Sequence, residues 1–275
     1  MKTLNISGDV RRVSGIRFHI QAFTAMVYRQ LVRFTRARSR LINAFTMPII
    51  WLVFFGLGWA SAFNRLGPVA RMLFKGLSYI EYLIPGLVLM SAFTGGLISG
   101  LAIIFDREFG YLKELLVTPA SRPISLLGRL VGDSIVATIQ STIMLIILMV
   151  VTEYTNILGF IAMIGIMLVT SLLASTIGAS LALSMASPEG FQAIVNLITM
   201  PMIFLSGAFY PLDTLKPPLS ILATINPLTH PVQLARWAMY GVIEEPLSLA
   251  IVGTIVYTLI FTILATVKYR RTYVA

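Results

Sequence analysis

Six apolar runs in this chain are each long enough to cross a lipid bilayer as a helix. A transmembrane helix needs about 20 mostly apolar residues to span about 30 Å of hydrocarbon, and none of these runs contains Asp, Glu, Lys or Arg. They cover residues 41–63, 82–105, 134–152, 156–186, 190–210 and 247–267. The pattern predicts an all-α polytopic membrane protein with six transmembrane helices, in which residues 1–275 form a single transmembrane domain.

The overall composition supports lipid as the main solvent of the chain. Hydrophobic residues make up 57% and charged residues 12% of the sequence, whereas soluble domains have roughly 45–50% apolar and about 25% charged residues. The net charge of +10 would suggest nucleic-acid binding in a soluble protein. Membrane proteins, however, concentrate Lys and Arg on cytoplasmic segments. We therefore expect membrane lipid as a partner and no nucleic acid.

The sequence gives little support to metal or catalytic chemistry. There is no cysteine, which excludes disulfides and thiolate chemistry. The two histidines, His19 and His230, are too isolated for a typical metal site. Ser206, Gly207 and His230 together might suggest an intramembrane serine protease, but no supporting catalytic motif is present. We expect no catalytic residues, no metal and no cofactor in this chain.

The distribution of positive charge predicts the orientation of the spans. An even number of spans places both termini on one side, and that side receives most of the 21 Lys and Arg residues. The opposite side receives only Arg65, Arg71, Lys75, Lys216 and Arg236. Because cytoplasmic segments carry the excess of positive residues, both termini are expected in the cytoplasm.

The segment before the first span, residues 16–40, has the pattern of an amphipathic helix. At about 100° per residue, apolar side chains gather on one arc: Ile16, Ile20, Phe23, Val27, Leu31 and Phe34. Basic side chains gather on roughly the opposite side: Arg29, Arg33, Arg36 and Arg40. A helix of this kind suits the cytoplasmic headgroup layer. The alternative is a helix that packs on another part of a protein.

Residues 211–246 interrupt the apolar pattern between spans five and six. Prolines break the segment, and its apolar piece, residues 219–225, is too short to span a membrane. Irregular backbone cannot face lipid. We therefore expect a re-entrant outer segment of short helices, which enters the membrane only where protein shelters it.

The charged stretch between spans two and three, residues 106–122, predicts a short cytoplasmic helix. Apolar residues repeat at helical spacing, Asp106 suits an N-cap, and Glu108 suits a first turn. Pro119 is expected to end the helix. The mixed charges favour docking to a protein over simple adhesion to lipid. An interfacial connector remains the alternative.

This stretch resembles the cytoplasmic loop of the ABC transporter type-2 permease family, which carries an Arg-Glu-x-Gly-x-x-x-x-Leu-Leu-x-(Thr/Ser)-Pro-x-Ser-Arg pattern. The matching residues are Arg107, Glu108, Gly110, Leu115, Leu116, Thr118, Pro119, Ser121 and Arg122. A second block resembles the Leu-Ser-Gly-x-x-(Phe/Tyr)-Pro turn and the Asn-Pro-(Leu/Met)-Thr segment of the same family. Its matching residues are Leu205, Ser206, Gly207, Tyr210, Pro211, Asn226, Pro227, Leu228 and Thr229.

The resemblance implies that the chain is the permease of an exporter in the plasma membrane of a prokaryote. Two copies of the permease would pair, as a homodimer, on two ATPase subunits. Residues 106–122 would be the coupling helix that contacts the ATPase. Asp106 would begin that helix, Arg107 and Glu108 would make its polar contacts, and Gly110 would permit close approach. Leu115 and Leu116 would anchor it to the membrane domain. The N-terminal helix would also contact the ATPase.

Several absences bear on the energy source. The chain lacks the G-x-x-x-x-G-K-(S/T) pattern, so ATP and Mg are expected on the partner subunit. Ionisable residues within a membrane usually mark ion or proton pathways, but Glu81, Asp133 and Glu153 lie at the edges of spans. Asp133 is also one helical turn from Arg129. These positions count against a stand-alone channel or secondary carrier, which is the alternative from another functional class.

The expected substrate is a hydrophobic or amphipathic small molecule, such as a drug or a lipid-like compound. The apolar spans offer an apolar lining, and the outer segments are too short to form a large domain that handles proteins. Export of a lipid-linked glycan or polysaccharide, which the same family performs, is the alternative. A wide pathway ringed with aromatic residues would favour that alternative.

Overall fold

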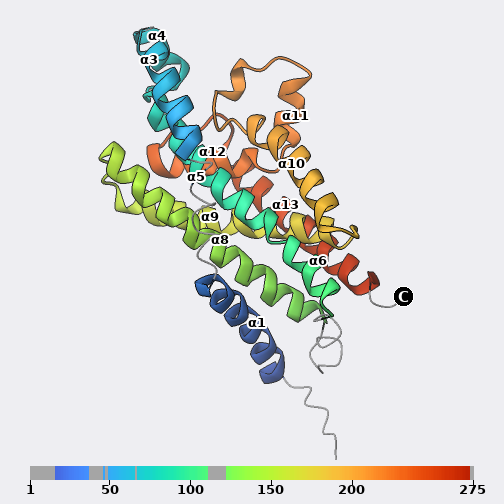
Figure 1. Ribbon diagram of the computed structural model, residues 1–275. Helices are drawn as coiled ribbons and strands as arrows, with labels where there is room; N and C mark the ends of the chain where they lie inside the picture. Colours follow the sequence, from blue (N-terminus) through green and yellow to red (C-terminus); the bar gives the residue numbers. More distant parts are fainter. Residues whose placement is uncertain (1–15, 37–45, 47–48, 66, 111–121, 273–275) are drawn as a thin grey trace, which may run out of the picture.

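The computed structural model describes residues 16–36, 46, 49–65, 67–110 and 122–272, and within these ranges the regular structure is entirely helical (Figure 1). This confirms the all-α class. Four stretches are long and apolar enough to cross a membrane: Tyr79–Glu108, Pro123–Val150, Ile157–Ala182 and Leu247–Arg271. A further apolar stretch, Ile49–Phe63, is shorter.

The four long stretches are built from five helices. The first stretch consists of α5 (Tyr79–Ile98) and α6 (Leu101–Glu108), and the others are α8 (Arg122–Thr152), α9 (Ile157–Ala182) and α13 (Leu247–Thr272). The remaining described elements are α1 (Ile16–Arg36), the π-helix η1 (Leu52–Trp59), α3 (Ala60–Asn64), α4 (Pro68–Leu73), α10 (Pro188–Phe204), the 3-10 helix η2 (Leu212–Thr214), α11 (Leu219–Ile225) and α12 (Thr229–Tyr240).

Several helix ends differ from the predicted spans. The third span was expected at residues 134–152, but α8 begins at Arg122, because its first turns pack against α1 rather than lipid. The fifth was expected at residues 190–210, but α10 ends at Phe204. Three residues later, Gly207 has a φ of +76°, a left-handed conformation that ends regular helix. The second span is divided between α5 and α6 near Ser99.

The helix α5 lies at the centre of the described bundle. It packs against α8, α9 and α12, and residues along most of its length are buried. By contrast, α13 exposes a broad apolar surface that includes Ile255, Leu259 and Ile263. Such a surface is unfavourable in water and natural in lipid, as expected for a helix long and apolar enough to span a membrane.

Glycines allow the backbones of α5 and α9 to approach closely. A Cβ atom on Gly178 would collide with the carbonyl oxygen of Leu97, and a Cβ on Gly96 would lie 2.5 Å from the carbonyl oxygen of Ser171. Small residues are typical of helix interfaces in membranes because they permit such packing.

Two glycines of α9 provide a matched test of this packing. Gly178→Ala should lower the free energy of unfolding by about 1–3 kcal/mol, because the added methyl overpacks a contact with backbone atoms. Gly165→Ala should preserve or raise stability, because no atom lies within 4 Å of the added Cβ and alanine favours helix by about 1 kcal/mol. Thermal unfolding of the purified variants measures both effects. Equal melting temperatures would contradict the packing argument.

The N-terminal helix α1 packs along the first half of α8 (Figure 1). Gly128 of α8 lies against the backbone of Phe23, and Gly132 lies against Val27 and Gln30. Met26 and Gln30 are buried, whereas Ile20 is 56% exposed. The buried face is therefore rotated from the predicted apolar arc, because close backbone approach at two glycines sets which side of α1 meets α8.

Residues 211–246 contain the short helices η2, α11 and α12. The hydroxyl of Tyr257, ten residues into α13, donates to the carbonyl oxygen of Ile225 at 2.8 Å. Gly253 of α13 lies against the ring of His230. At the other end of α12, the hydroxyl of Tyr154 donates to the carbonyl oxygen of Met239 at 2.7 Å. The segment therefore runs alongside α13 and returns toward the start of α9.

Candidate functional site

The predicted coupling segment begins inside a helix rather than at the start of one. Asp106, expected to be an N-cap, lies in the last turn of α6, so that prediction was wrong. Its side chain is 5% exposed and accepts a hydrogen bond from Arg129 Nη1 to Oδ2 at 2.6 Å. Arg29 Nη2 lies 3.4 Å from the other carboxylate oxygen. Two guanidinium groups from other helices therefore hold this carboxylate inside the protein.

The electrostatics explain why Asp106 needs these partners. The C-terminal end of a helix carries partial negative charge, so an acid there is unfavourable by itself. Burial adds a desolvation cost, which close ionic partners offset. Arg129 is also buried, and its Nε lies 3.7 Å from Oδ2 of Asp133, one turn along α8. The predicted proximity of Arg129 and Asp133 is confirmed. The end of α6 is thus tied to both α1 and α8.

The next residues divide between the protein interior and its surface. The guanidinium of Arg107 donates to the carbonyl oxygen of Met185, just beyond α9. The side chain of Glu108 is exposed and forms no hydrogen bond or ion pair with another residue in the described ranges. Phe109 is 70% exposed, and its ring stacks on Phe105. Of the two residues expected to make polar contacts with a partner, only Glu108 presents its side chain outward.

Beyond Phe109, the chain turns at Gly110, which has a φ of +76°. This left-handed conformation favours glycine over other residues. Four further residues of the predicted coupling set lie outside the described ranges: Leu115, Leu116, Thr118 and Pro119. Arg122 is the first residue of α8. Among the predicted basic residues of the N-terminal helix, Arg29 reaches Asp106, Arg33 is partly exposed and Arg36 is exposed, whereas Arg40 lies outside the described ranges.

The predicted residues of the outer segment form a turn at the end of α10. The hydroxyl of buried Ser206 donates to the carbonyl oxygen of Ile203 at 2.6 Å, and Gly207 follows in the left-handed conformation. Asn226 Nδ2 donates to the carbonyl oxygen of Met202 at 2.7 Å, which joins the end of α11 to α10. Pro211 is buried, Tyr210 is partly buried, and Pro227 lies between Asn226 and α12. These contacts indicate a structural turn rather than a catalytic serine.

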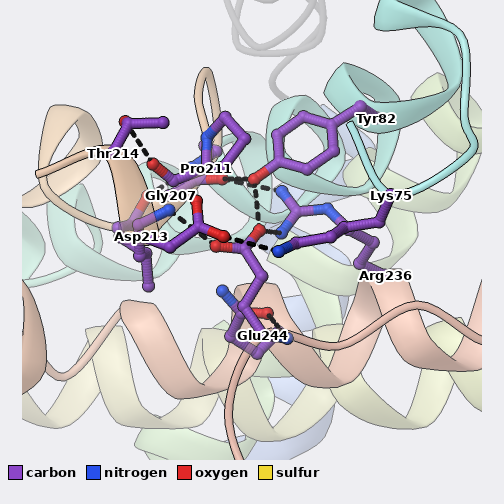
Figure 2. Close-up of polar contacts among 12 residues, drawn as sticks. Lys75, Tyr82, Gly207, Pro211, Asp213, Thr214, Arg236 and Glu244 are labelled. Atoms are coloured by element: carbon purple, nitrogen blue, oxygen red, sulfur yellow. Dashed lines mark hydrogen bonds and ion pairs between the residues drawn. The ribbon is translucent and has the colours of Figure 1, made fainter. Parts of the chain in front are cut away.

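A buried carboxylate that the sequence analysis missed, Glu244, organises this region (Figure 2). Its Oε1 accepts from the Tyr82 hydroxyl at 2.6 Å and from Arg236 Nη1 at 3.2 Å. Its Oε2 accepts from the backbone N–H of Leu212 at 2.6 Å. One side chain thus joins α5, α12 and the turn at η2.

Arg236 completes the cluster from α12. Its side chain is fully buried, and its Nη2 donates to the carbonyl oxygen of Gly207 at 2.7 Å. The guanidinium carbon lies 3.6 Å from the centroid of the Tyr82 ring, a cation–π contact. Oε1 of the neighbouring residue Glu245 lies 3.0 Å from His230 Nδ1, within hydrogen-bond distance. Two successive acids therefore hold two bases of α12.

A second, exposed pair lies beside the cluster. Lys75 Nζ donates to Asp213 Oδ2 at 2.5 Å, which joins the loop before α5 to η2. The hydrogen bond to Asp213 raises the pKa of Lys75 above its ordinary value. Because both side chains are 40% or more exposed, the pair contributes little to stability.

Sequence signals for the cluster of Tyr82, Arg236 and Glu244, called the outer cluster below, were weak. The hydrogen-bonded partners Tyr82 and Glu244 lie 162 positions apart, so no local pattern connects them. Arg236 was assigned only to the outer side, although an arginine among apolar residues is itself a signal for a buried acidic partner. Within the described ranges, no three His, Cys, Asp or Glu residues gather closely enough to hold a metal ion.

Comparisons with known proteins agree on one family. The model of the family described as "ABC-2 type transporter" matches residues 21–240. The ycf38 protein of Porphyra purpurea, named as a transport permease, is 30% identical over 79% of this chain and 74% of that protein. Its namesake from Cyanophora paradoxa is 28% identical over 80% and 74%. The daunorubicin resistance ABC transporter permease protein DrrB1 of Streptomyces coeruleorubidus is 23% identical over 87% and 84%.

Proposed function

Because the chain belongs to the ABC-2 type transporter family and is a transmembrane permease subunit of an ABC transporter, we propose that it exports its substrate from the cytoplasm. ATP hydrolysis in a separate ATPase subunit drives the export. Two permease copies form a homodimer on two ATPase subunits, which bind ATP and Mg. The complex resides in the plasma membrane of a prokaryote.

The observation that carries this proposal is the exposed end of α6. Glu108 and Phe109 project outward next to Asp106, which is held by Arg129 and Arg29. An acid at a helix C-terminus is unfavourable without a partner, so the exposed Glu108 suits contact with a second protein. The clamped Asp106 provides the rigid attachment through which that protein moves the membrane helices.

We further propose six spans, with residues 41–63 and α10 as the two that complete the four long stretches. Both termini lie in the cytoplasm, and residues 211–246 form a re-entrant outer segment. The bond between Tyr257 and Ile225 supports this, because ten residues of α13 correspond to a depth of about 15 Å. α1 lies at the cytoplasmic surface of the membrane, against α8.

The cysteine-free chain permits a direct test of this topology. A single cysteine introduced at exposed Lys216 should react with a membrane-impermeant maleimide added outside intact cells. A cysteine at exposed Glu189 should react only after the membrane is permeabilised. The reverse pattern would disprove the proposed orientation.

The proposed substrate is a hydrophobic or amphipathic small molecule. The relative DrrB1 is named for daunorubicin resistance, which supports a drug-like substrate. Aromatic side chains from η1, the end of α10 and the segment after it also gather in one cluster that includes Phe55, Phe204 and Phe209. Such a cluster offers apolar contacts for planar or lipid-like molecules, and the same contacts suit the lipid part of a lipid-linked glycan, which is the second candidate substrate.

The decisive experiment combines the purified permease with the ABC ATPase subunit proposed as its partner. The two proteins should co-purify, and inverted vesicles that contain both should accumulate a labelled amphipathic drug only when ATP is supplied. A lipid-linked glycan serves as the competing substrate in the same vesicles. Uphill accumulation by the permease without an ATPase or nucleotide would instead identify a secondary carrier.

A further inference from the structure

The helices α5 and α6 are held at both ends by buried carboxylates. At the inner end, Asp106 of α6 is bound by Arg129 and Arg29. At the outer end, the hydroxyl of Tyr82 donates to Glu244 at 2.6 Å (Figure 2). Tyr82 and Asp106 are separated by about 36 Å at 1.5 Å per residue. The same helix pair thus reaches both the coupling segment and the outer segment.

Close packing restricts bending of this pair, including at the break near Ser99. The junction between α5 and α6 lies against α9, where Gly100 contacts the backbone of Gly178. At the outer end, a Cβ on Gly86 would lie 2.6 Å from the Cβ of Ala208, so the turn that contains Ala208 is packed directly on α5. Densely packed interfaces do not deform continuously. Such packing favours transmission of a displacement at Asp106 along the pair.

The outer cluster can receive such a displacement. Glu244 binds Tyr82 of α5 through one oxygen and the N–H of Leu212 through the other. Tyr82 and Leu212 are thus bonded to the two oxygens of one carboxylate, which links the position of Tyr82 to that of the turn at residues 207–214.

On the basis of the proposed function, we propose that Tyr82 and Glu244 are positioning residues that make the outer turn, residues 207–214, move with the end of α6 at Asp106. The α5–α6 pair transmits the movement, and the Tyr82–Glu244 hydrogen bond passes it to Leu212. Opening of the outer side is thereby linked to the nucleotide state of the partner ATPase.

Hydrogen exchange of the outer turn tests this inference. In the permease–ATPase complex in lipid nanodiscs, exchange of the Leu212 amide should differ several-fold between the nucleotide-free and ATP-trapped states. Tyr82→Phe removes the hydroxyl but keeps the ring over Arg236, and it should abolish that difference. ATPase binding and basal ATP hydrolysis should remain unchanged.

Tyr257→Phe is the matched control, because it removes a hydroxyl that joins the outer segment to α13 instead of α5. This variant should retain the nucleotide-dependent difference at Leu212. An unchanged difference in Tyr82→Phe would overturn the inference. Equal exchange in both nucleotide states of the wild type would also overturn it.

A second arm uses the permease alone and does not depend on the proposed function. Arg29→Gln weakens the inner clamp while Arg129 remains bound to Asp106. It should change the exchange of Leu212 in the wild-type background and leave it unchanged in the Tyr82→Phe background. If Arg29→Gln had equal effects on Leu212 exchange in both backgrounds, transmission through Tyr82 would be disproved. Failure of the ATPase to bind would count against the proposed function only, because the Arg29→Gln experiment tests the link from Asp106 to Leu212 without an ATPase.

Discussion

Glu108→Ala should abolish ATP-driven transport by the assembled complex while leaving the permease folded and inserted in the membrane. Glu108 is exposed at the end of α6 and makes no polar contact with other residues that the structure describes. Its removal therefore breaks no side-chain bond that the structure describes and relieves an unfavourable charge at a helix C-terminus, worth about 0.3–1 kcal/mol. Transport, by contrast, loses the outward-facing acid through which the ATPase engages the permease.

Transport into inverted vesicles and thermal unfolding of the purified variant measure the two effects separately. Glu189→Ala is the matched control, because Glu189 is another exposed acid, in the first turn of α10. It should transport at the wild-type rate. Full transport by Glu108→Ala would remove Glu108 from the coupling contact. Loss of folding in that variant would show that the residue has an internal role instead.

Asp106→Ala should lower the free energy of unfolding by about 3–5 kcal/mol, the usual cost of removing one partner from a buried ion pair. Arg129 is 4% exposed and would lose its 2.6 Å partner. Asp133, at 3.7 Å, remains as a weaker partner. Because Asp106 also binds Arg29, the contact between α6 and α1 should loosen, and proteolysis of α1 should become faster.

Asp213→Ala provides the control for Asp106→Ala. Asp213 also forms a short ion pair, at 2.5 Å with Lys75, but its side chain is 52% exposed. Surface pairs contribute about 0–1 kcal/mol, so this variant should unfold close to the wild-type temperature. Similar destabilisation of the two variants would show that burial does not distinguish the pairs.

Local sequence patterns predicted the helical class and the approximate positions of the long helices. They also singled out Gly207, whose left-handed φ ends the extension of α10, and the proximity of Arg129 to Asp133. They failed at Asp106, where a capping pattern suggested a new helix. In the structure, α6 continues to Glu108, because the bonds from Arg129 and Arg29 stabilise an acid where the helix dipole opposes it.

The sequence by itself determined that this is a membrane protein, because partition of a segment into the membrane depends on the composition of that segment. It also indicated a transport permease, because the family motifs are short and can be recognised from the sequence alone. Only the tertiary structure decided that Asp106 faces two arginines and that Glu244 joins Tyr82, Leu212 and Arg236. Those bonds join residues distant in the chain. The effect of a buried charge on stability depends on the partner that folding brings within hydrogen-bond distance.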